Sequence, residues 1–156
     1  MPSIIEVDPQ GADALALLRE AAIDAKALYP ELFVAGGPPA SNPPVGARSV
    51  YVVAYLDACP VACGAFRPLD EFTAEIRRIY VHRDHRRKGL ARAVLAHLER
   101  AAIRLDYRRL ALETGYKQTP AMGLYEAWGF RRIAPFGEYL GDPTSVCYER
   151  HLDLEE

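Results

Sequence analysis

A short basic segment carries the residues of this chain that are best suited to binding an anion. It reads Arg86-Arg87-Lys88-Gly89-Leu90-Ala91-Arg92, after a strand-like stretch and at the start of a helix-like one. The first amides of a helix lack an intrahelical acceptor and carry the positive end of the helix dipole, so they can donate to an anion. Gly89 and Ala91 are small enough to let phosphates come close. The segment predicts a diphosphate-binding turn, and the alternative is a solvated basic turn without a ligand.

The chain before this segment predicts one helix and a run of strands. Residues 4–7 favour a short strand, and apolar residues at three- and four-residue spacing favour a helix from residue 13 to about 32, bent or broken at Pro30. Residues 35–48 are rich in Pro and Gly and predict a long exposed loop. Residues 49–56, 61–67 and 73–81 then predict an antiparallel meander of three strands.

The second half predicts a crossover and a final pair of strands. Residues 89–105 place their apolar side chains on one face of a helix that Asp106 ends, and residues 109–114 form a buried strand parallel to the third meander strand. Thr119, as N-cap, and Pro120 start a further helix, which Gly129 stops. Residues 130–133 and 145–152 are the last two strands. The whole chain, residues 1–156, is expected to form one domain.

Two motifs resemble those of the GNAT superfamily of N-acyltransferases. The first is a strand followed by Arg-x-x-Gly-x-Ala at residues 86–91 and a helix, and the second is Leu112-Glu113-Thr114-Gly115 followed by Ala121-x-x-Leu124-Tyr125-x-x-x-Gly129-Phe130. The resemblance covers nearly the whole chain. It implies a GNAT-like α/β fold, an α+β mixed sheet with an antiparallel meander, a strand-helix-strand crossover and a C-terminal strand pair. The chain departs from the pattern at Gln118, where the family often has Asn, and at Ala91, where it often has Gly.

The resemblance implies acetyl-CoA as the cosubstrate and no metal. Amides of the basic turn would cradle the pyrophosphate, and amides of the third meander strand, at a bulge, would face the thioester and the pantetheine arm. Gln118 would make a polar contact on the cofactor side. The expected cofactor-binding residues are Ile79, Tyr80, Val81, Arg86, Arg87, Lys88, Gly89, Leu90, Ala91, Arg92 and Gln118.

Two residues are expected to be catalytic. Tyr125 matches the tyrosine that the family uses as general acid, and its reference pKa of about 10 lies above that of a thiol near 8.5, so it can protonate the leaving thiolate. The alternative is a packing tyrosine. Glu75 stands eleven positions before Arg86, where some members of the family place a catalytic carboxylate. It is expected either to accept the proton of the amine or to form a structural ion pair with Arg77 or Arg78.

The acceptor pocket is expected to involve Tyr29, Arg67, Arg77 and Tyr139. Arginines there would suit an acceptor with a carboxylate, such as an amino acid. The predicted function is transfer of an acetyl group from acetyl-CoA to a primary amine of a small molecule, directly in a ternary complex. Acetylation of a protein or peptide amine is one alternative, and a non-catalytic acyl-CoA sensor is another.

Composition argues against other classes of protein. A net charge of −2 and the absence of a P-loop or stacking motif disfavour a nucleic-acid partner or a membrane surface. The absence of a long apolar run and of a basic, apolar start predicts a cytoplasmic protein. The three cysteines lack the spacing of a disulfide framework or zinc site and are expected to be buried apolar residues. By analogy with similar folds, a homodimer through the last strands is an option.

Overall fold

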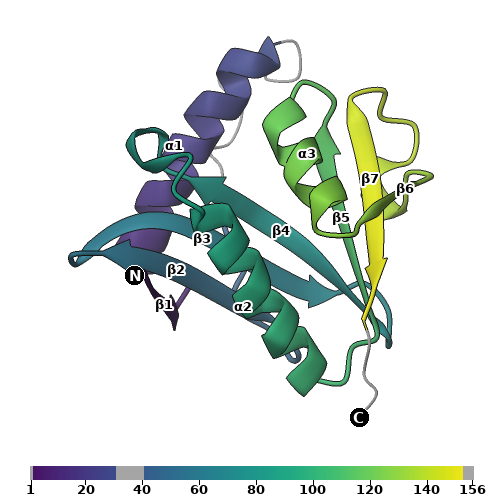
Figure 1. The fold of residues 1–156 in the computed structure, drawn as a ribbon, viewed down its shortest axis with the longest axis horizontal. Helices are drawn as coiled ribbons and strands as arrows, with labels where there is room; N and C mark the ends of the chain where they lie inside the picture. Colours follow the sequence, from purple (N-terminus) through teal and green to yellow (C-terminus); the bar gives the residue numbers. More distant parts are fainter. Residues whose placement is uncertain (1, 31–40, 153–156) are drawn as a thin grey trace.

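The computed structural model describes residues 2–30 and 41–152, and all that follows concerns these residues. They form a seven-stranded mixed sheet of order β1-β2-β3-β4-β5-β7-β6, shown in Figure 1. The strands are β1 (Ser3–Glu6), β2 (Val50–Leu56), β3 (Cys59–Pro68), β4 (Thr73–Val81), β5 (Arg109–Gly115), β6 (Arg131–Ile133) and β7 (Ser145–His151). The helices are α1 (Ala12–Leu28), α2 (Leu90–Arg104) and α3 (Thr119–Ala127).

The order of pairing confirms the predicted fold class. Strands β1 to β4 pair antiparallel in sequence order, and the crossover through α2 makes β5 parallel to β4. The last two strands pair with each other, and β7 also pairs antiparallel with β5, which leaves β6 at the edge of the sheet. The homodimer through these strands stays a prediction.

Helices cover both faces of the sheet. Ala14 and Leu17 of α1 pack on one face, against Tyr51, Val53 and Cys63. The other face carries the larger core, in which α2 and Tyr125 of α3 pack against the meander and β5. The predicted apolar face of α2 is confirmed, because Leu90, Val94, Leu98 and Ala101 are all buried.

Strand β4 bends at a bulge. Ala65 of β3 pairs with Arg77, but the next paired positions are Cys63 and Tyr80, so Gly64 alone lies opposite Arg78 and Ile79. Arg78 has a φ of 63°, in the left-handed region that non-glycine residues rarely adopt. The pairing of β4 with β5 also ends just before the bulge, at Ile76 and Leu112. The outer parts of β4 and β5 therefore part, and a gap opens between them.

The predicted ends of α2 and α3 are mostly correct, but the predicted N-cap of α3 and the predicted burial of Cys59 are wrong. Asp106 (φ 69°) and Gly129 (φ 104°) adopt the left-handed conformation beyond the ends of α2 and α3, as predicted. Thr119 is not the N-cap of α3, because the helix already includes it and Gln118 caps it without a side-chain hydrogen bond. Cys59 is exposed at the start of β3, although Cys63 and Cys147 are buried as expected. Helix α1 ends at Leu28, with Tyr29 as its C-cap, so it stops just before Pro30. Residues 31 and 32 of the predicted helix and residues 35–40 of the predicted loop lie outside the described residues.

Gly64→Ala tests the packing under the bulge. A Cβ at Gly64 would lie 2.6 Å from Val94 Cγ1 and 2.8 Å from Ile79 Cδ1, so the core must shift to accept it. We expect the free energy of unfolding to fall by about 1–3 kcal/mol, measured by chemical denaturation. Gly123→Ala is the control, because a Cβ there meets nothing within 4 Å. It should leave stability unchanged or raise it by about 1 kcal/mol. Equal stability of the two variants would contradict the expected tight packing at Gly64.

Candidate active site

The basic turn leads directly into α2. A 3₁₀ turn (Arg83–His85) follows β4, and Gly89, with a φ of 78°, is the N-cap of α2. Arg87 also has a positive φ of 66°, and alternation of this kind turns successive amides toward one concave surface. The first intrahelical bond of α2 is that from Ala93 N to Gly89 O, so the preceding amides are free for an anion. The backbone of this turn therefore has free donors at the start of α2, and the binding of a diphosphate to them stays a prediction.

Two of the basic side chains of this turn contact other parts of the protein, and two do not. Arg86 donates to the Val81 carbonyl at 3.0 Å and to the Asp24 carboxylate at 2.9 Å, so its side chain is bound to β4 and α1. The Arg92 guanidinium lies 5.5 Å from the centre of the Trp128 ring. Arg87 and Lys88 are exposed, and within the described chain neither forms a salt bridge. Their side chains are the ones left to meet a diphosphate.

Two amides of β4 face the gap beside β5. His82 N donates to Val61 O of β3 at 2.8 Å, and backbone groups alternate in direction along a strand, so Tyr80 also faces β3. Ile79 and Val81 face the other way, as the bond from Arg86 to the Val81 carbonyl also indicates. Strand β5 no longer pairs with β4 at these positions. The amides of Ile79 and Val81 thus have no partner on β5, while the Tyr80 hydroxyl donates to Asp24 of α1 at 3.1 Å.

Tyr125 lies on α3 with its ring in the core. The ring contacts Phe130 and Tyr148 at centroid distances of 5.8 and 6.0 Å. Burial raises the pKa of its hydroxyl well above the ordinary value, and the charge of Glu113 adds to this shift. The phenol therefore keeps its proton at neutral pH. Gln118 is the N-cap of the same helix, and its backbone N–H donates to Gly115 O at 2.9 Å.

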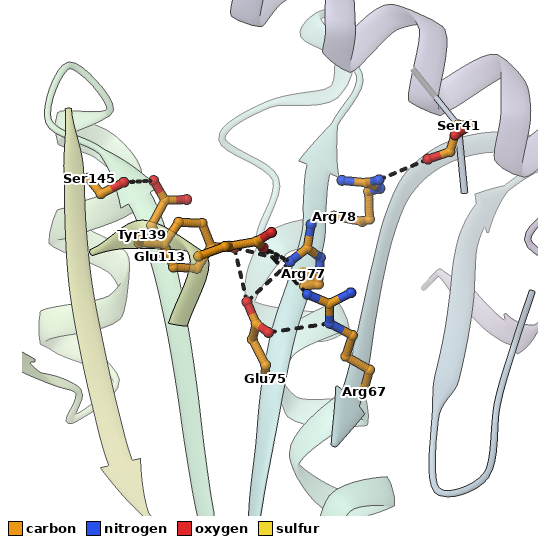
Figure 2. Close-up of polar contacts among 9 residues, drawn as sticks. Ser41, Arg67, Glu75, Arg77, Arg78, Glu113, Tyr139 and Ser145 are labelled. Atoms are coloured by element: carbon orange, nitrogen blue, oxygen red, sulfur yellow. Dashed lines mark hydrogen bonds and ion pairs between the residues drawn. The ribbon is translucent and has the colours of Figure 1, made fainter. Parts of the chain in front are cut away.

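Glu75 is buried and lies at the centre of a cluster of charged side chains, shown in Figure 2. Arg67 and Arg77 contact its two carboxylate oxygens at 3.3 and 3.2 Å, and the Tyr139 hydroxyl donates to it at 2.9 Å. Arg77 also pairs at 2.6 Å with Glu138, which lies in the 3₁₀ turn (Gly137–Tyr139). The structure thus shows the ion pair of Glu75 with Arg77 and adds one with Arg67. It shows none with Arg78.

Three of the four predicted acceptor residues come together and one does not. Arg67, Arg77 and Tyr139 all contact Glu75. Tyr29 is buried at the end of β5 instead, where its hydroxyl accepts a hydrogen bond of 2.7 Å from Lys117 N and lies against Gly115. Tyr29 therefore supports the turn between β5 and α3 and does not reach the Glu75 cluster.

No site role was predicted from the sequence for two residues, of which the structure places one beside the gap and the other at the bulge. Glu113 lies on β5 beyond the last pair with β4, accepts a hydrogen bond of 2.7 Å from the Ser145 hydroxyl, and has its pKa raised by burial. Arg78 lies at the bulge and binds Asn42 Oδ1 and Ser41 O. The sequence contained a hint of each residue. Glu113 is a lone carboxylate in a strand predicted to be buried, and the consecutive Arg77 and Arg78 break the alternation of polar and apolar residues expected in a regular strand.

Two general classes of site find no support in the part of the chain that the structure covers. No cluster of three His, Cys, Asp or Glu side chains in residues 2–30 and 41–152 has the arrangement of a metal site. Within the same ranges, no helix is long and apolar enough to cross a membrane.

Comparison with known proteins identifies the family. Residues 23–130 match the family described as the acetyltransferase (GNAT) family. An uncharacterized N-acetyltransferase of Bacillus subtilis, YsnE, is 41% identical over 92 residues, which are 58% of this chain and 61% of that protein. An IAA acetyltransferase of Azospirillum brasilense is 32% identical over 103 residues, 65% of this chain and 67% of that one. The chain thus spans about three fifths to two thirds of the length of these relatives.

Solved structures agree with this assignment over nearly the whole chain. A protein from Klebsiella pneumoniae described as an acyl-CoA N-acyltransferase superposes with a TM-score of 0.80 and 31% identity, over 98% of this chain and 99% of that one. A GNAT acetyltransferase from Elizabethkingia anophelis has the same fold, with a TM-score of 0.70 and 17% identity over 97% of this chain and 98% of that one. The family match, which includes the basic turn and Tyr125, and the Klebsiella structure show that the chain belongs to the acetyltransferase (GNAT) family.

Proposed function

We propose that this protein transfers an acetyl group from acetyl-CoA to a primary amine of a small molecule, directly within a ternary complex. The observation that carries the proposal is the gap between β4 and β5, which has the free amides of α2 at one end and the unpaired amides of Ile79 and Val81 along it. The Elizabethkingia relative, whose structure contains acetyl-CoA, supports the choice of cosubstrate.

The proposed donor site uses mainly backbone groups. The diphosphate binds the amides of residues 87–92, with Arg87 and Lys88 contributing charge. The pantetheine arm follows the gap, and the thioester carbonyl accepts from an amide near the bulge. An amide aimed at the oxyanion that develops during attack can lower the barrier by about 3 kcal/mol. This arrangement polarises the carbonyl without a metal.

The proposed proton transfers use a base and an acid on different elements. The amine must lose a proton to attack, and the thiolate must gain one to leave. We assign the base to Glu113, because its raised pKa improves its affinity for a proton, whereas the oxygens of Glu75 are already occupied by three donors. Glu75 then acts as a positioning residue that holds Arg77 and Tyr139. Tyr125 protonates the thiolate from its buried hydroxyl.

Two alternatives remain distinct from this proposal. A protein or peptide amine would need an open groove on the acceptor side, and the Azospirillum relative, named an IAA acetyltransferase, favours a small acceptor instead. A non-catalytic acyl-CoA sensor would have no use for a protonated Tyr125 and a carboxylate of raised pKa near the same gap.

Release of free CoA from acetyl-CoA tests the proposed reaction. We expect release above the acceptor-free background with amino acids or other small amines, and less with peptides. Chromatographic detection is required, because the exposed Cys59 would react with thiol reagents. Acetyl-CoA binding without release for any group of amines would favour the sensor, and release with peptides alone would favour a peptide acetyltransferase.

Tyr125→Phe tests the general acid. The substitution keeps the ring that packs on Phe130 and Tyr148 and removes only the hydroxyl. We expect kcat to fall by about 100-fold, with the Kd for acetyl-CoA and the melting temperature nearly unchanged. Steady-state kinetics and calorimetry provide these values. A kcat equal to that of the parent protein would leave Tyr125 a packing residue.

Glu113→Gln and Glu75→Gln separate the base from the positioning residue. The carboxylate form of Glu113 is the base, so its raised pKa predicts that activity falls with decreasing pH at a higher pH than an exposed glutamate would give. We expect Glu113→Gln to lower kcat by about 100-fold and to abolish this acid limb of the pH profile. Glu75→Gln should mainly lower the melting temperature and raise the KM for the acceptor. The reverse result, with the acid limb lost only in Glu75→Gln, would make Glu75 the base.

A further inference from the structure

A cavity of about 400 Å³ adjoins the bulge on the α1 face of the sheet. One wall is the segment before β2, where Pro43, Pro44 and Val45 make it largely apolar, and the opposite wall is formed by β3 and β4. Arg67, Arg77 and Arg78 stand along this second wall. The volume is in the range of small-molecule sites and suits a ligand the size of one amino acid.

Among the described residues beside this cavity, positive side chains outnumber negative ones. Arg67 and Arg77 share the carboxylates of Glu75 and Glu138. Arg78 instead donates to two neutral oxygens, Asn42 Oδ1 and Ser41 O, each at 3.0 Å. Within residues 2–30 and 41–152, no carboxylate lies within salt-bridge distance of it. Three guanidinium groups thus line the cavity, two of them are paired with carboxylates behind it, and among the described residues Arg78 is the one without such a partner.

The local backbone fixes the place of this excess charge. Asn42 is buried and its side-chain amide donates to Pro9 O and to the Tyr51 hydroxyl, so the group that orients Arg78 is itself held in position. The bulge presents Arg78 to the cavity together with Arg77, whereas a regular strand would turn one of them away. Arg78 is partly buried and lies next to the charge of Arg77, which lowers its pKa and leaves its charge poorly solvated. A poorly solvated cation gains from pairing with an anion.

We propose that this cavity is the acceptor site and that it takes a small amine with a carboxylate on an apolar body, the carboxylate being bound by Arg78. A guanidinium can bind a carboxylate through two parallel hydrogen bonds, and Arg78 has donors beyond the two already used. The apolar body lies on the proline-rich wall. The amine then points to the bulge, beside the amides that face the thioester. The inference rests on the proposed function and names its substrate class.

Binding of matched acids and amides tests the proposal without acetyl-CoA. The probes are L-leucine, L-phenylalanine and L-tryptophan, each compared with its carboxamide, by calorimetry up to about 10 mM. We expect at least one acid to bind at least about tenfold more tightly than its amide, as a charge-assisted contact provides. Equal binding of acids and amides, or binding of none of the acids, overturns the proposal. Binding of a peptide with a free C-terminus but of no free amino acid overturns it as well.

Variants assign the effect to Arg78. Arg78→Gln should weaken binding of the acid by about tenfold to a hundredfold and leave its amide unchanged, and Arg78→Lys should fall between. Arg104→Gln is the control, because it removes the same charge from an exposed position in the last turn of α2. Thermal melting verifies that each variant is folded. Unchanged acid binding in folded Arg78→Gln overturns the proposal.

A separate titration with acetyl-CoA keeps this proposal distinct from the proposed function. If acetyl-CoA binds and CoA is released with amines that lack a carboxylate, the acetyltransferase proposal holds and the acceptor class is wrong. If acetyl-CoA does not bind the parent protein, the proposed function fails, whatever the acids do.

Discussion

The bulge in β4 is the local feature on which both halves of the site depend. By inserting an unmatched residue opposite Gly64, it turns β4 away from its regular register with β3, close to the point where pairing with β5 ends. On the β5 side this leaves the amides of Ile79 and Val81 without strand partners. On the α1 face it presents Arg77 and Arg78 to the same cavity. A regular strand would satisfy its amides and alternate its side chains, and neither binding surface would then exist.

The conformational cost of this bulge is offset by contacts on both sides of it. Arg78, at a φ of 63°, is held by Asn42 and Ser41, and Arg77 is held by Glu75, Glu138 and Tyr139. Below it, Gly64 leaves room for Ile79 and Val94, which would meet any larger side chain. A strained residue persists when its surroundings determine its position in this way. The bulge is therefore already formed, and binding at the proposed site would not require the strand to be ordered first.

The sequence predicted those features that depend on neighbouring residues. Apolar periodicity identified α2 and its buried face, and the basic turn with Gly89 marked the start of that helix. Features that depend on contacts between residues far apart in the sequence could not be predicted from it. The pair of Glu75 with Arg77, two positions away, was among the predicted ones, but its partners Arg67 and Tyr139 are eight and 64 positions away. The environment of Arg78 depends on Asn42, 36 positions before it. Tyr29 shows the same limit, because the contact that places it at β5 is with Lys117, 88 positions later.

The proposed site recognises its two substrates through different kinds of groups, and this difference affects how its specificity can change. In the proposed site the donor is held mainly by backbone amides, whose positions are set by the helix start and the bulge and change little when side chains are substituted. The acceptor meets side chains on the α1 face, where one substitution can alter charge or shape. Arg67 and Arg77 are committed to Glu75 and Glu138, so their replacement would disturb the cluster itself. Among the described residues, Arg78 donates only to neutral oxygens, so in the proposed site its replacement changes the charge that meets the acceptor without breaking an ion pair.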